Sequence, residues 1–312
     1  MNERAQLNSL VVDVNLAVGA ATDVGGRPGN EDRVHASELA GGDRPGPAGG
    51  AFLLAVADGM GGHQRGEVAS RMAIEAVVET VGRDPGPDPA LLLKQAFRRA
   101  NEMIYEDGRN GGRDDPMGTT LVAAVLRGKY ATIASVGDSR AYLVRANALT
   151  QITKDHSVVA EQVARGTLTA NQARESPRRN VLTEALGQRA KLNAKLPEIF
   201  ELTLLPKDRL LLCTDGFYDV IDDRDYVRTL LEFDPQSAAK HLIELAVQRG
   251  TTDNVSAVVV EAMPTRVLAQ ILQQAPAASG RGLATGQIVV LVMATAVIVV
   301  IAILLIAMGV FP

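Results

Sequence analysis

Phe52-Leu-Leu-Ala-Val-Ala-Asp58-Gly-Met-Gly-Gly62 is the stretch of this chain that decides its fold. The apolar run predicts a strand buried in a core, and the aspartate followed by glycines predicts the place where that strand ends. Three other aspartates stand next to strand-like runs that lie far away in the sequence. They are Asp138 after residues 132–136, Asp215 after residues 210–214 and Asp253 before residues 255–260.

Strand ends from distant segments can meet at one edge of a sheet. Four carboxylates gathered there would repel one another unless a cation lay between them. Hard divalent ions such as Mg²⁺, Mn²⁺ and Ca²⁺ take oxygen ligands of this kind. A single Asp-Gly pair is more typical of a hairpin turn, so the prediction of a metal site depends on all four positions together.

The patterning predicts one α+β domain over residues 17–261. Strand-like runs adjoin one another in several places, which favours antiparallel sheet over a strict alternation of strands and helices. The predicted strands cover 16–21, 51–57, 119–126, 131–136, 141–144, 210–214 and 255–260. The predicted helices cover 67–81, 90–106, 222–231 and 237–248, with Ser237 as the N-cap of the last one. Residues 41–50 are a loop by composition and are expected to join two strands.

The composition limits the classes of function. The 312 residues suffice for one large domain or two ordinary ones. The net charge is −4 and no basic block occurs, which argues against a nucleic-acid partner. The one cysteine, Cys213, excludes an internal disulfide, is typical of a reducing compartment, and is interpreted as a core thiol.

The two ends of the chain differ from the middle. Met1 to Leu10 mix polar and charged side chains and lack the apolar core of a signal peptide, and residues 1–16 are interpreted as a lead-in. Residues 262–287 are interpreted as a linker. Residues 288–311 carry no charge, and a helix of that length would span about 36 Å, more than the roughly 30 Å of bilayer hydrocarbon. This segment is predicted to be a single transmembrane helix.

The predicted span also carries an orientation signal. Arg266 and Arg281 are the only charged residues after position 261, and both precede the span. The tendency of basic residues to stay inside therefore predicts a cell-membrane protein whose domain over residues 17–261 is cytoplasmic.

Six short motifs occur in a recognisable order. They are Asp23-Val-Gly-Gly-Arg27-Pro-Gly-Asn30-Glu31-Asp32, Asp58-Gly-Met-Gly-Gly62, Met117-Gly-Thr-Thr120, Gly137-Asp-Ser-Arg140, Asp215-Gly216 and Asp253-Asn254. Each motif is weak alone, but the ordered set closely resembles the metal-dependent serine/threonine protein phosphatases of type 2C in their bacterial form. The resemblance covers residues 17–261. It implies a central β-sandwich of two antiparallel sheets, flanked by helices on both faces.

The resemblance also implies a centre of two Mn²⁺ or Mg²⁺ ions that hydrolyses phosphoserine and phosphothreonine. According to this resemblance, Asp58 would bridge the two ions and the Gly59 carbonyl would bind one of them. Asp215 and Asp253 would bind the other ion. Arg27 would hold the substrate phosphate, a role that suits its forked guanidinium. Two such ions can acidify a water and neutralise phosphoryl charge, so no covalent intermediate is needed.

Further positions follow from the same resemblance. Glu31 and Asp32 would hold metal-bound waters or support the ligands, and Asp138 resembles the ligand of a third, weaker ion. Glycines at 59, 61 and 62 are expected to let a metal and a substrate approach the backbone. Thr119 and Thr120 are expected to pack and bond locally.

The chain departs from the family pattern at two places. Many eukaryotic members have histidine after the first Asp-Gly, where this chain has Met60, so the proton donor to the leaving alcohol is not assigned. Bacterial relatives often have His-Pro before an Arg-Asn-Val-Leu run, where this chain has Ser176-Pro177. His63 and His156 lie near the predicted site and could assist proton transfer, although structural roles are the alternative.

Two other functions stay open at this point. A pseudophosphatase scaffold would bind phosphoproteins without turnover, and the intact acids at positions 58, 215 and 253 argue against it. A phosphoesterase of small molecules is disfavoured by residues 155–187, which resemble the flap beside a protein-substrate groove. The expected partners are phosphorylated proteins, a serine/threonine kinase with its substrates, and the membrane.

Overall fold

The computed structural model describes residues 14–39, 50–61, 65–83, 88–110 and 117–264. All of them belong to the first of the two units into which the chain divides, Met1–Leu268. The predicted span at 288–311 and nearly all of the predicted linker and of the loop at 41–50 lie outside these residues. Within the described ranges, no helix has the length and apolar character that crossing a membrane requires.

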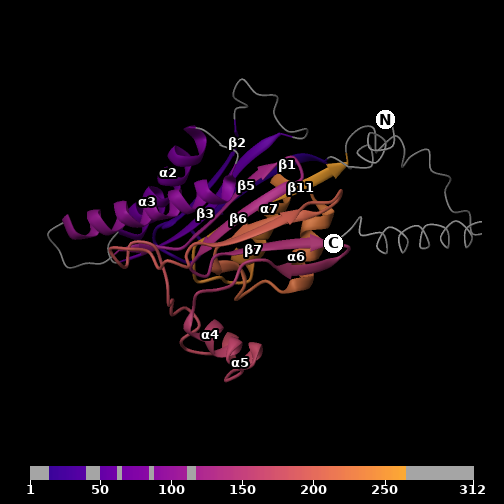
Figure 1. The fold of residues 1–312 in the computed structure, drawn as a ribbon. Coiled ribbons are helices and arrows are strands. Elements are labelled where there is room, and N and C mark those ends of the chain that lie inside the picture. Colours follow the sequence, from indigo (N-terminus) through magenta and orange to yellow (C-terminus); the bar gives the residue numbers. More distant parts are fainter. Residues whose placement is uncertain (1–13, 40–49, 62–64, 84–87, 111–116, 265–312) are drawn as a thin grey trace, which may run out of the picture. The chain divides into compact units, whose positions relative to one another are not determined.

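Two antiparallel sheets form the centre of the fold (Figure 1). The first has the order β1-β11-β10-β7-β8, and the second has the order β2-β3-β5-β6-β9, with β4 paired to β3. The strands of the first sheet are β1 (Val14–Asp23), β11 (Val255–Pro264), β10 (Arg209–Cys213), β7 (Arg140–Arg145) and β8 (Ala148–Gln151). Those of the second are β2 (Asp32–Glu38), β3 (Ala51–Met60), β4 (Gly118–Thr119), β5 (Leu121–Arg127), β6 (Tyr130–Val136) and β9 (Glu198–Thr203).

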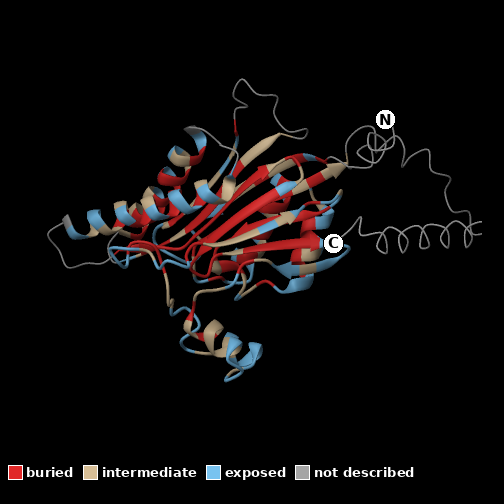
Figure 2. Ribbon diagram, viewed as in Figure 1, coloured by how far each residue is buried: buried red, intermediate tan, exposed pale blue. Residues whose placement is uncertain are grey.

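Helices cover the outer face of each sheet. α2 (Arg65–Arg83) and α3 (Pro89–Asn110) pack on the second sheet, and α6 (Asp223–Glu232) and α7 (Pro235–Gln248) pack on the first. Figure 2 shows the buried residues gathered on the strands and on the sides of the helices that face them. The predicted α+β sandwich flanked by helices is therefore confirmed.

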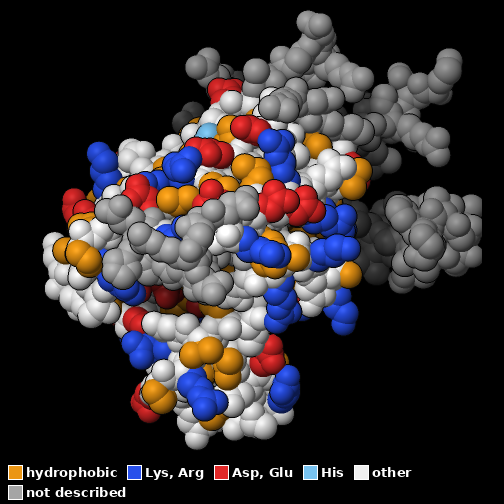
Figure 3. Space-filling model, turned by 90° about the vertical axis from the view of Figure 1, so that its left-hand side faces the viewer, with side chains coloured by type: hydrophobic (Ala, Val, Ile, Leu, Met, Phe, Trp, Pro, Cys, Tyr) orange, Lys and Arg blue, Asp and Glu red, His pale blue; other side chains and the backbone are white. Residues whose placement is uncertain are grey.

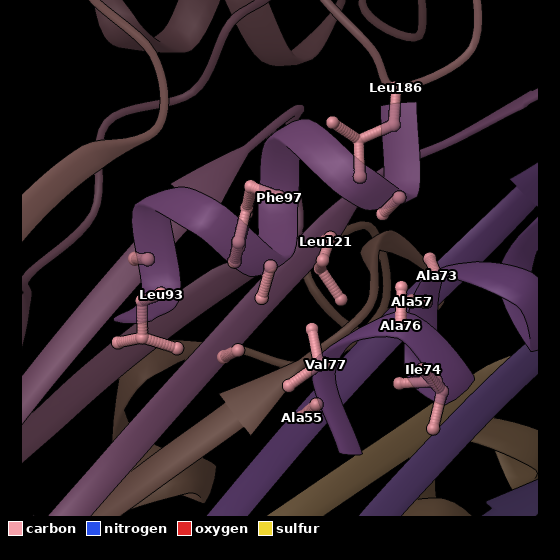
Figure 4. Close-up of a cluster of buried hydrophobic side chains, with 14 of the residues drawn as sticks. Ala55, Ala57, Ala73, Ile74, Ala76, Val77, Leu93, Phe97, Leu121 and Leu186 are labelled. Atoms are coloured by element: carbon pink, nitrogen blue, oxygen red, sulfur yellow. The ribbon is translucent and has the colours of Figure 1, made fainter. Parts of the chain in front are cut away.

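The continuous apolar run of β3 has a structural reason. Leu54 and Val56 enter the core between the two sheets, whereas Leu53, Ala55 and Ala57 enter the core beneath α2 and α3. A strand that is covered on both faces needs apolar residues at every position rather than at alternate ones. Figure 4 shows Ala55 and Ala57 facing small and branched side chains of α2, which lets this helix lie close to the sheet.

Several predicted boundaries change. β1 begins at Val14, so the end of the predicted lead-in 1–16 belongs to the sheet, and β11 continues to Pro264. The predicted strand at 119–126 is interrupted at Thr120, between β4 and β5. The predicted N-cap Ser237 is wrong, because the Asp234 side chain accepts the N–H groups of Gln236 and Ser237 and so caps the helix.

Residues 155–187 leave the sandwich and carry two short helices, α4 (Val158–Ala164) and α5 (Ala170–Arg174). Figure 1 shows both helices standing away from the sheets. Isolated bridges between Ser157 and Leu182 and between Thr119 and Leu186 tie the two ends of this segment to each other and to the body. We call residues 155–187 the flap. Its few buried side chains contrast with the sandwich.

Candidate functional site

A pocket of about 480 Å³ opens at the edge of the sandwich where β3 and β6 end and β11 begins. We call it the acidic pocket. It is lined by Arg27, Glu31, Asp58, Gly59, Met60, Gly61, Thr120, Asp138, Asn180, Val181, Leu182, Gln188, Asp215, Asp253 and Asn254. Figure 3 shows acidic side chains inside a hollow on this face of the molecule.

All but one of the predicted site residues line the acidic pocket. The exception is Asp32, which lies behind it on β2, directly opposite Asp58 of β3. Like charges on directly opposed residues destabilise a sheet unless something compensates for them. One carboxylate oxygen of Asp32 accepts a hydrogen bond of 2.8 Å from the Thr214 hydroxyl, and the other has no partner.

The Met117-Gly-Thr-Thr120 motif holds Asp58 in place. The Asp58 carbonyl accepts hydrogen bonds from the Thr119 hydroxyl at 2.8 Å and from the Thr120 N–H at 2.9 Å. The Asp58 N–H donates to the Thr120 hydroxyl at 3.0 Å. The expectation that these threonines bond locally is therefore confirmed. Their bonds fix the backbone that presents the Asp58 carboxylate.

Asn254 holds the loop that carries Arg27. Its side-chain amide donates to the carbonyls of Val24 and Gly29 at 2.8 and 2.9 Å, and its oxygen accepts the Glu31 N–H at 2.9 Å. Arg27 in turn donates from Nη2 to Asp253 Oδ2 at 2.7 Å. That hydrogen bond is the largest cause of a raised pKa for Arg27. The guanidinium thus stays charged beside the carboxylates.

Burial and mutual repulsion disfavour the charged forms of the pocket acids. Burial raises the pKa of Asp58 well above its ordinary value, and the negative charges of Asp215 and Asp32 raise it further. Burial is also the largest cause that raises the pKa of Asp215 to about 6, of Asp32 to about 7 and of Asp138 to about 8. The described lining residues include one cation, Arg27, to oppose these carboxylates.

The acids fit hydrated divalent cations. Asp32 and Asp215 each keep a buried carboxylate oxygen without a hydrogen-bond partner. Among the described residues, no three His, Cys, Asp or Glu side chains form a ready-made ligand group. Ions such as Mg²⁺ retain several waters and therefore need few protein ligands. Carboxylates that are gathered loosely around a pocket suit such a hydrated ion better than an ion enclosed by protein ligands on all sides.

Two glycines are required by local packing. A Cβ on Gly59 would lie 2.0 Å from the Gly66 carbonyl oxygen at the start of α2. Glycine is therefore needed at this position for packing, in addition to the expected approach of a metal and a substrate to the backbone. Gly137 has a φ of +99°, and a Cβ on it would lie 2.6 Å from the Thr120 side chain. This turn brings Asp138 to the pocket.

His156 has a structural contact rather than a place in the acidic pocket. Its Nδ1 accepts the Gly137 N–H at 3.0 Å, and it does not line the pocket. His63 lies outside the described residues. Asn180 and Gln188 do line the pocket, although no role was predicted for them. Asn180 belongs to the Arg-Asn-Val-Leu run at residues 179–182, from which no place in the pocket was predicted, and no signal in the sequence marks Gln188. The flap and the residue directly after it bring these two side chains to the pocket through tertiary contacts.

Comparison with known proteins gives consistent matches. A model of the family described as protein phosphatase 2C matches residues 30–263. The serine/threonine protein phosphatase PstP of Mycobacterium tuberculosis is 37% identical over 236 residues, which are 75% of this chain and 42% of that protein. The chain thus spans less than half of that relative. The serine/threonine phosphatase stp of Listeria welshimeri is 35% identical over 214 residues, which are 67% of this chain and 84% of that protein.

A solved structure matches as well. The catalytic domain of PstP, in complex with 2 manganese ions, has a TM-score of 0.67 and 35% identity, and the match covers 80% of this chain and 98% of that chain.

Proposed function

The chain belongs to the protein phosphatase 2C family, and on that premise we propose that it hydrolyses phosphoserine and phosphothreonine in proteins with Mn²⁺ or Mg²⁺ as its cofactor. The observation that carries the proposal is the set of buried and partly buried carboxylates that share one pocket with Arg27, the one arginine among its described lining residues. Related proteins named serine/threonine phosphatases, one of them with bound manganese, support it.

The proposed roles follow the geometry of the pocket. Asp58, the Gly59 carbonyl, Asp215 and Asp253 would hold two ions. When bound, the ions would supply an acidified water and neutralise phosphoryl charge. Arg27 uses Nη2 to reach Asp253, which aims the guanidinium at the pocket and leaves its other N–H donors for the substrate phosphate.

The remaining acids would have supporting roles. Asp32 lies behind Asp58 and would orient it or hold a water, and Glu31 would do the same at the rim of the pocket. Asp138 also lines the pocket, where it would hold a third and weaker ion. Its carbonyl accepts a hydrogen bond from the Tyr218 hydroxyl at 3.1 Å, which anchors its backbone independently of any ion.

The test is release of inorganic phosphate from a phosphothreonine peptide by the full chain. We expect release to need Mn²⁺ or Mg²⁺ and to stop in excess chelator, with p-nitrophenyl phosphate as the comparison substrate. Peptide binding without release, in the presence of either ion, would indicate a pseudophosphatase instead. A kcat/KM that is far higher for the small ester than for the peptide would indicate a small-molecule phosphoesterase.

The proposal includes a location and a partner. Residues 288–311 would anchor the chain in the cell membrane, with Arg266 and Arg281 keeping the catalytic part in the cytoplasm. Its substrates would include a serine/threonine kinase of the same membrane and the targets of that kinase. Protease added to intact spheroplasts should leave the catalytic part uncut. Its digestion while the membrane stays sealed would reverse the orientation.

A further inference from the structure

A second charged pocket, of about 370 Å³, lies between α3 and the start of β9. We call it the basic pocket. Its lining includes four cations, Lys94, Arg98, Lys154 and Lys195, and one acid, Glu198. The cations are exposed, whereas Leu196 and Pro197 between them are buried. A basic rim around an apolar floor suits an anionic side chain that also has carbon to bury.

Within the described residues, the side chains of these four cations have no ion pair and no hydrogen bond. By contrast, Arg140, Arg145 and Arg209 each bind a carboxylate. Lys94 and Arg98 also stand four residues apart on α3, an arrangement of like charges that destabilises a helix. Because the chain as a whole is acidic, this gathering of cations is not explained by composition or by folding.

A third pocket shares lining residues with both the basic pocket and the acidic pocket. This third pocket, of about 520 Å³, lies between the flap and the body. It shares Asp138 and Asn180 with the acidic pocket, and it shares Lys154 and Glu198 with the basic pocket. An extended peptide whose phosphate occupies the acidic pocket can therefore run along the flap and place a second side chain in the basic pocket.

We propose that the basic pocket binds a second anionic side chain of the phosphoprotein substrate, so that acidic or doubly phosphorylated segments are preferred. The inference rests on the proposed phosphatase activity and names its substrate class. Exposed, flexible cations contribute little one at a time and are screened by salt, so the preference should be moderate and should fall with ionic strength. The shared lining residues favour a substrate segment over an anionic lipid surface as the occupant.

The experiment compares three phosphothreonine peptides of equal length, which carry neutral residues, a run of glutamates or a second phosphothreonine on one side of the first. A matching set places the acids on the other side. The full chain, the Lys94→Ala/Arg98→Ala double variant and a control double variant are assayed at low and high salt. The control, Arg224→Ala/Lys240→Ala, removes two exposed cations from α6 and α7 on the other sheet.

We expect the unchanged protein to prefer one acidic series over the neutral peptide by roughly three- to tenfold in kcat/KM, mainly through KM. That ratio should approach one in the Lys94→Ala/Arg98→Ala protein and at high salt, and it should persist in the control. Comparison of the glutamate and phosphothreonine peptides identifies which anion fits better. A ratio near one in the unchanged protein, or equal losses in both double variants, would overturn the proposal.

A binding assay separates this inference from the proposed function. Fluorescence anisotropy of the same peptides, carrying a phosphonate in place of the first phosphate, reports the preference even if no peptide is hydrolysed. Sedimentation with vesicles that contain phosphatidylserine tests the membrane alternative. Loss of vesicle binding in the Lys94→Ala/Arg98→Ala protein, with unchanged peptide ratios, would assign the basic pocket to the membrane and contradict its role in substrate binding.

Discussion

Buried and partly buried aspartates occur in two regions of this molecule, and their negative charge is compensated in opposite ways in the two regions. Outside the acidic pocket, Asp208 accepts a forked contact from Arg145, Asp155 accepts one from Arg140, and Asp225 pairs with two arginines. In the acidic pocket, Asp138 is buried, Asp58 and Asp215 are partly buried, and no described arginine pairs with any of the three.

This difference shows which groups must supply the positive charge that compensates each carboxylate. A buried carboxylate is costly unless a cation or several donors compensate for it. The chain supplies that cation at the structural aspartates, which tie β7 and α6 to their neighbours. At the pocket aspartates, most of the compensation is left to ions from solution. Each prediction below tests one side of this contrast.

The largest expected effect is on catalysis at Asp58. Asp58→Asn removes the negative charge that would lie between two ions, and loss of several kcal/mol of charge stabilisation lowers kcat by about a thousandfold or more. Phosphate release from a phosphothreonine peptide measures it, with circular dichroism as the control for folding. Near-normal turnover in this variant would remove Asp58 from the proposed site.

The next effect separates the two regions by stability. Asp208→Asn removes the carboxylate of a buried aspartate that pairs with the partly exposed Arg145, so we expect a loss of about 2–3 kcal/mol in the free energy of unfolding. Asp58→Asn in metal-free protein relieves repulsion instead and should be neutral or stabilising. Urea unfolding of both variants in chelator measures the contrast. Destabilisation of equal size in both would show that the pocket aspartates are compensated within the chain.

The pH dependence of stability should reveal the uncompensated acids. Raised pKa values, about 6 for Asp215, 7 for Asp32 and 8 for Asp138, mean that the metal-free folded state holds more protons than the unfolded state above about pH 4. The free energy of unfolding should therefore fall by several kcal/mol as pH rises from about 4 to 8. Saturating Mn²⁺ should remove most of this fall. A flat profile without metal would contradict the predicted charge imbalance.

Arg27 is the one cation that lines the acidic pocket within the described residues. Arg27→Ala should reduce kcat/KM for phosphopeptides by roughly ten- to thirtyfold, because the phosphate loses a bidentate donor and Asp253 loses its hydrogen bond. Arg27→Lys should have more activity than Arg27→Ala but less than the unchanged protein, since the lysine ammonium cannot donate two parallel hydrogen bonds to one phosphate as a guanidinium does. Steady-state kinetics on both variants measure the loss. Full rescue by lysine would mean that charge alone is needed there.

The smallest expected effect is at Asp138. Asp138→Ala should leave two ions bound but slow turnover by a few-fold and shift the Mn²⁺ concentration that activity requires, since a site with few ligands binds weakly. Calorimetric titration with Mn²⁺, run alongside phosphate-release kinetics, separates the two effects. Unchanged kinetics over the whole Mn²⁺ range would leave Asp138 as a turn residue.

The predictions from sequence succeeded where burial was complete. Strands at the centre of each sheet, such as β3 and β11, have apolar runs because both of their faces are covered. β2, β8 and β9 were not predicted, and all three are edge strands with many half-buried or exposed residues. Their residues alternate weakly, because one side of an edge strand meets solvent or loop rather than core.

The sequence by itself determined the family, the sandwich and the acidic residues of the pocket. Strand ends and Asp-Gly turns are formed by residues that are neighbours in the chain, so short sequence motifs are enough to identify them. Only the tertiary structure decided that Asn180 and Gln188 reach the acidic pocket, that His156 binds a backbone N–H, and that Lys154 joins Lys94 and Arg98. These contacts join segments that lie far apart in the sequence. They depend on how the flap and α3 pack against the sheets, which no single stretch of sequence encodes.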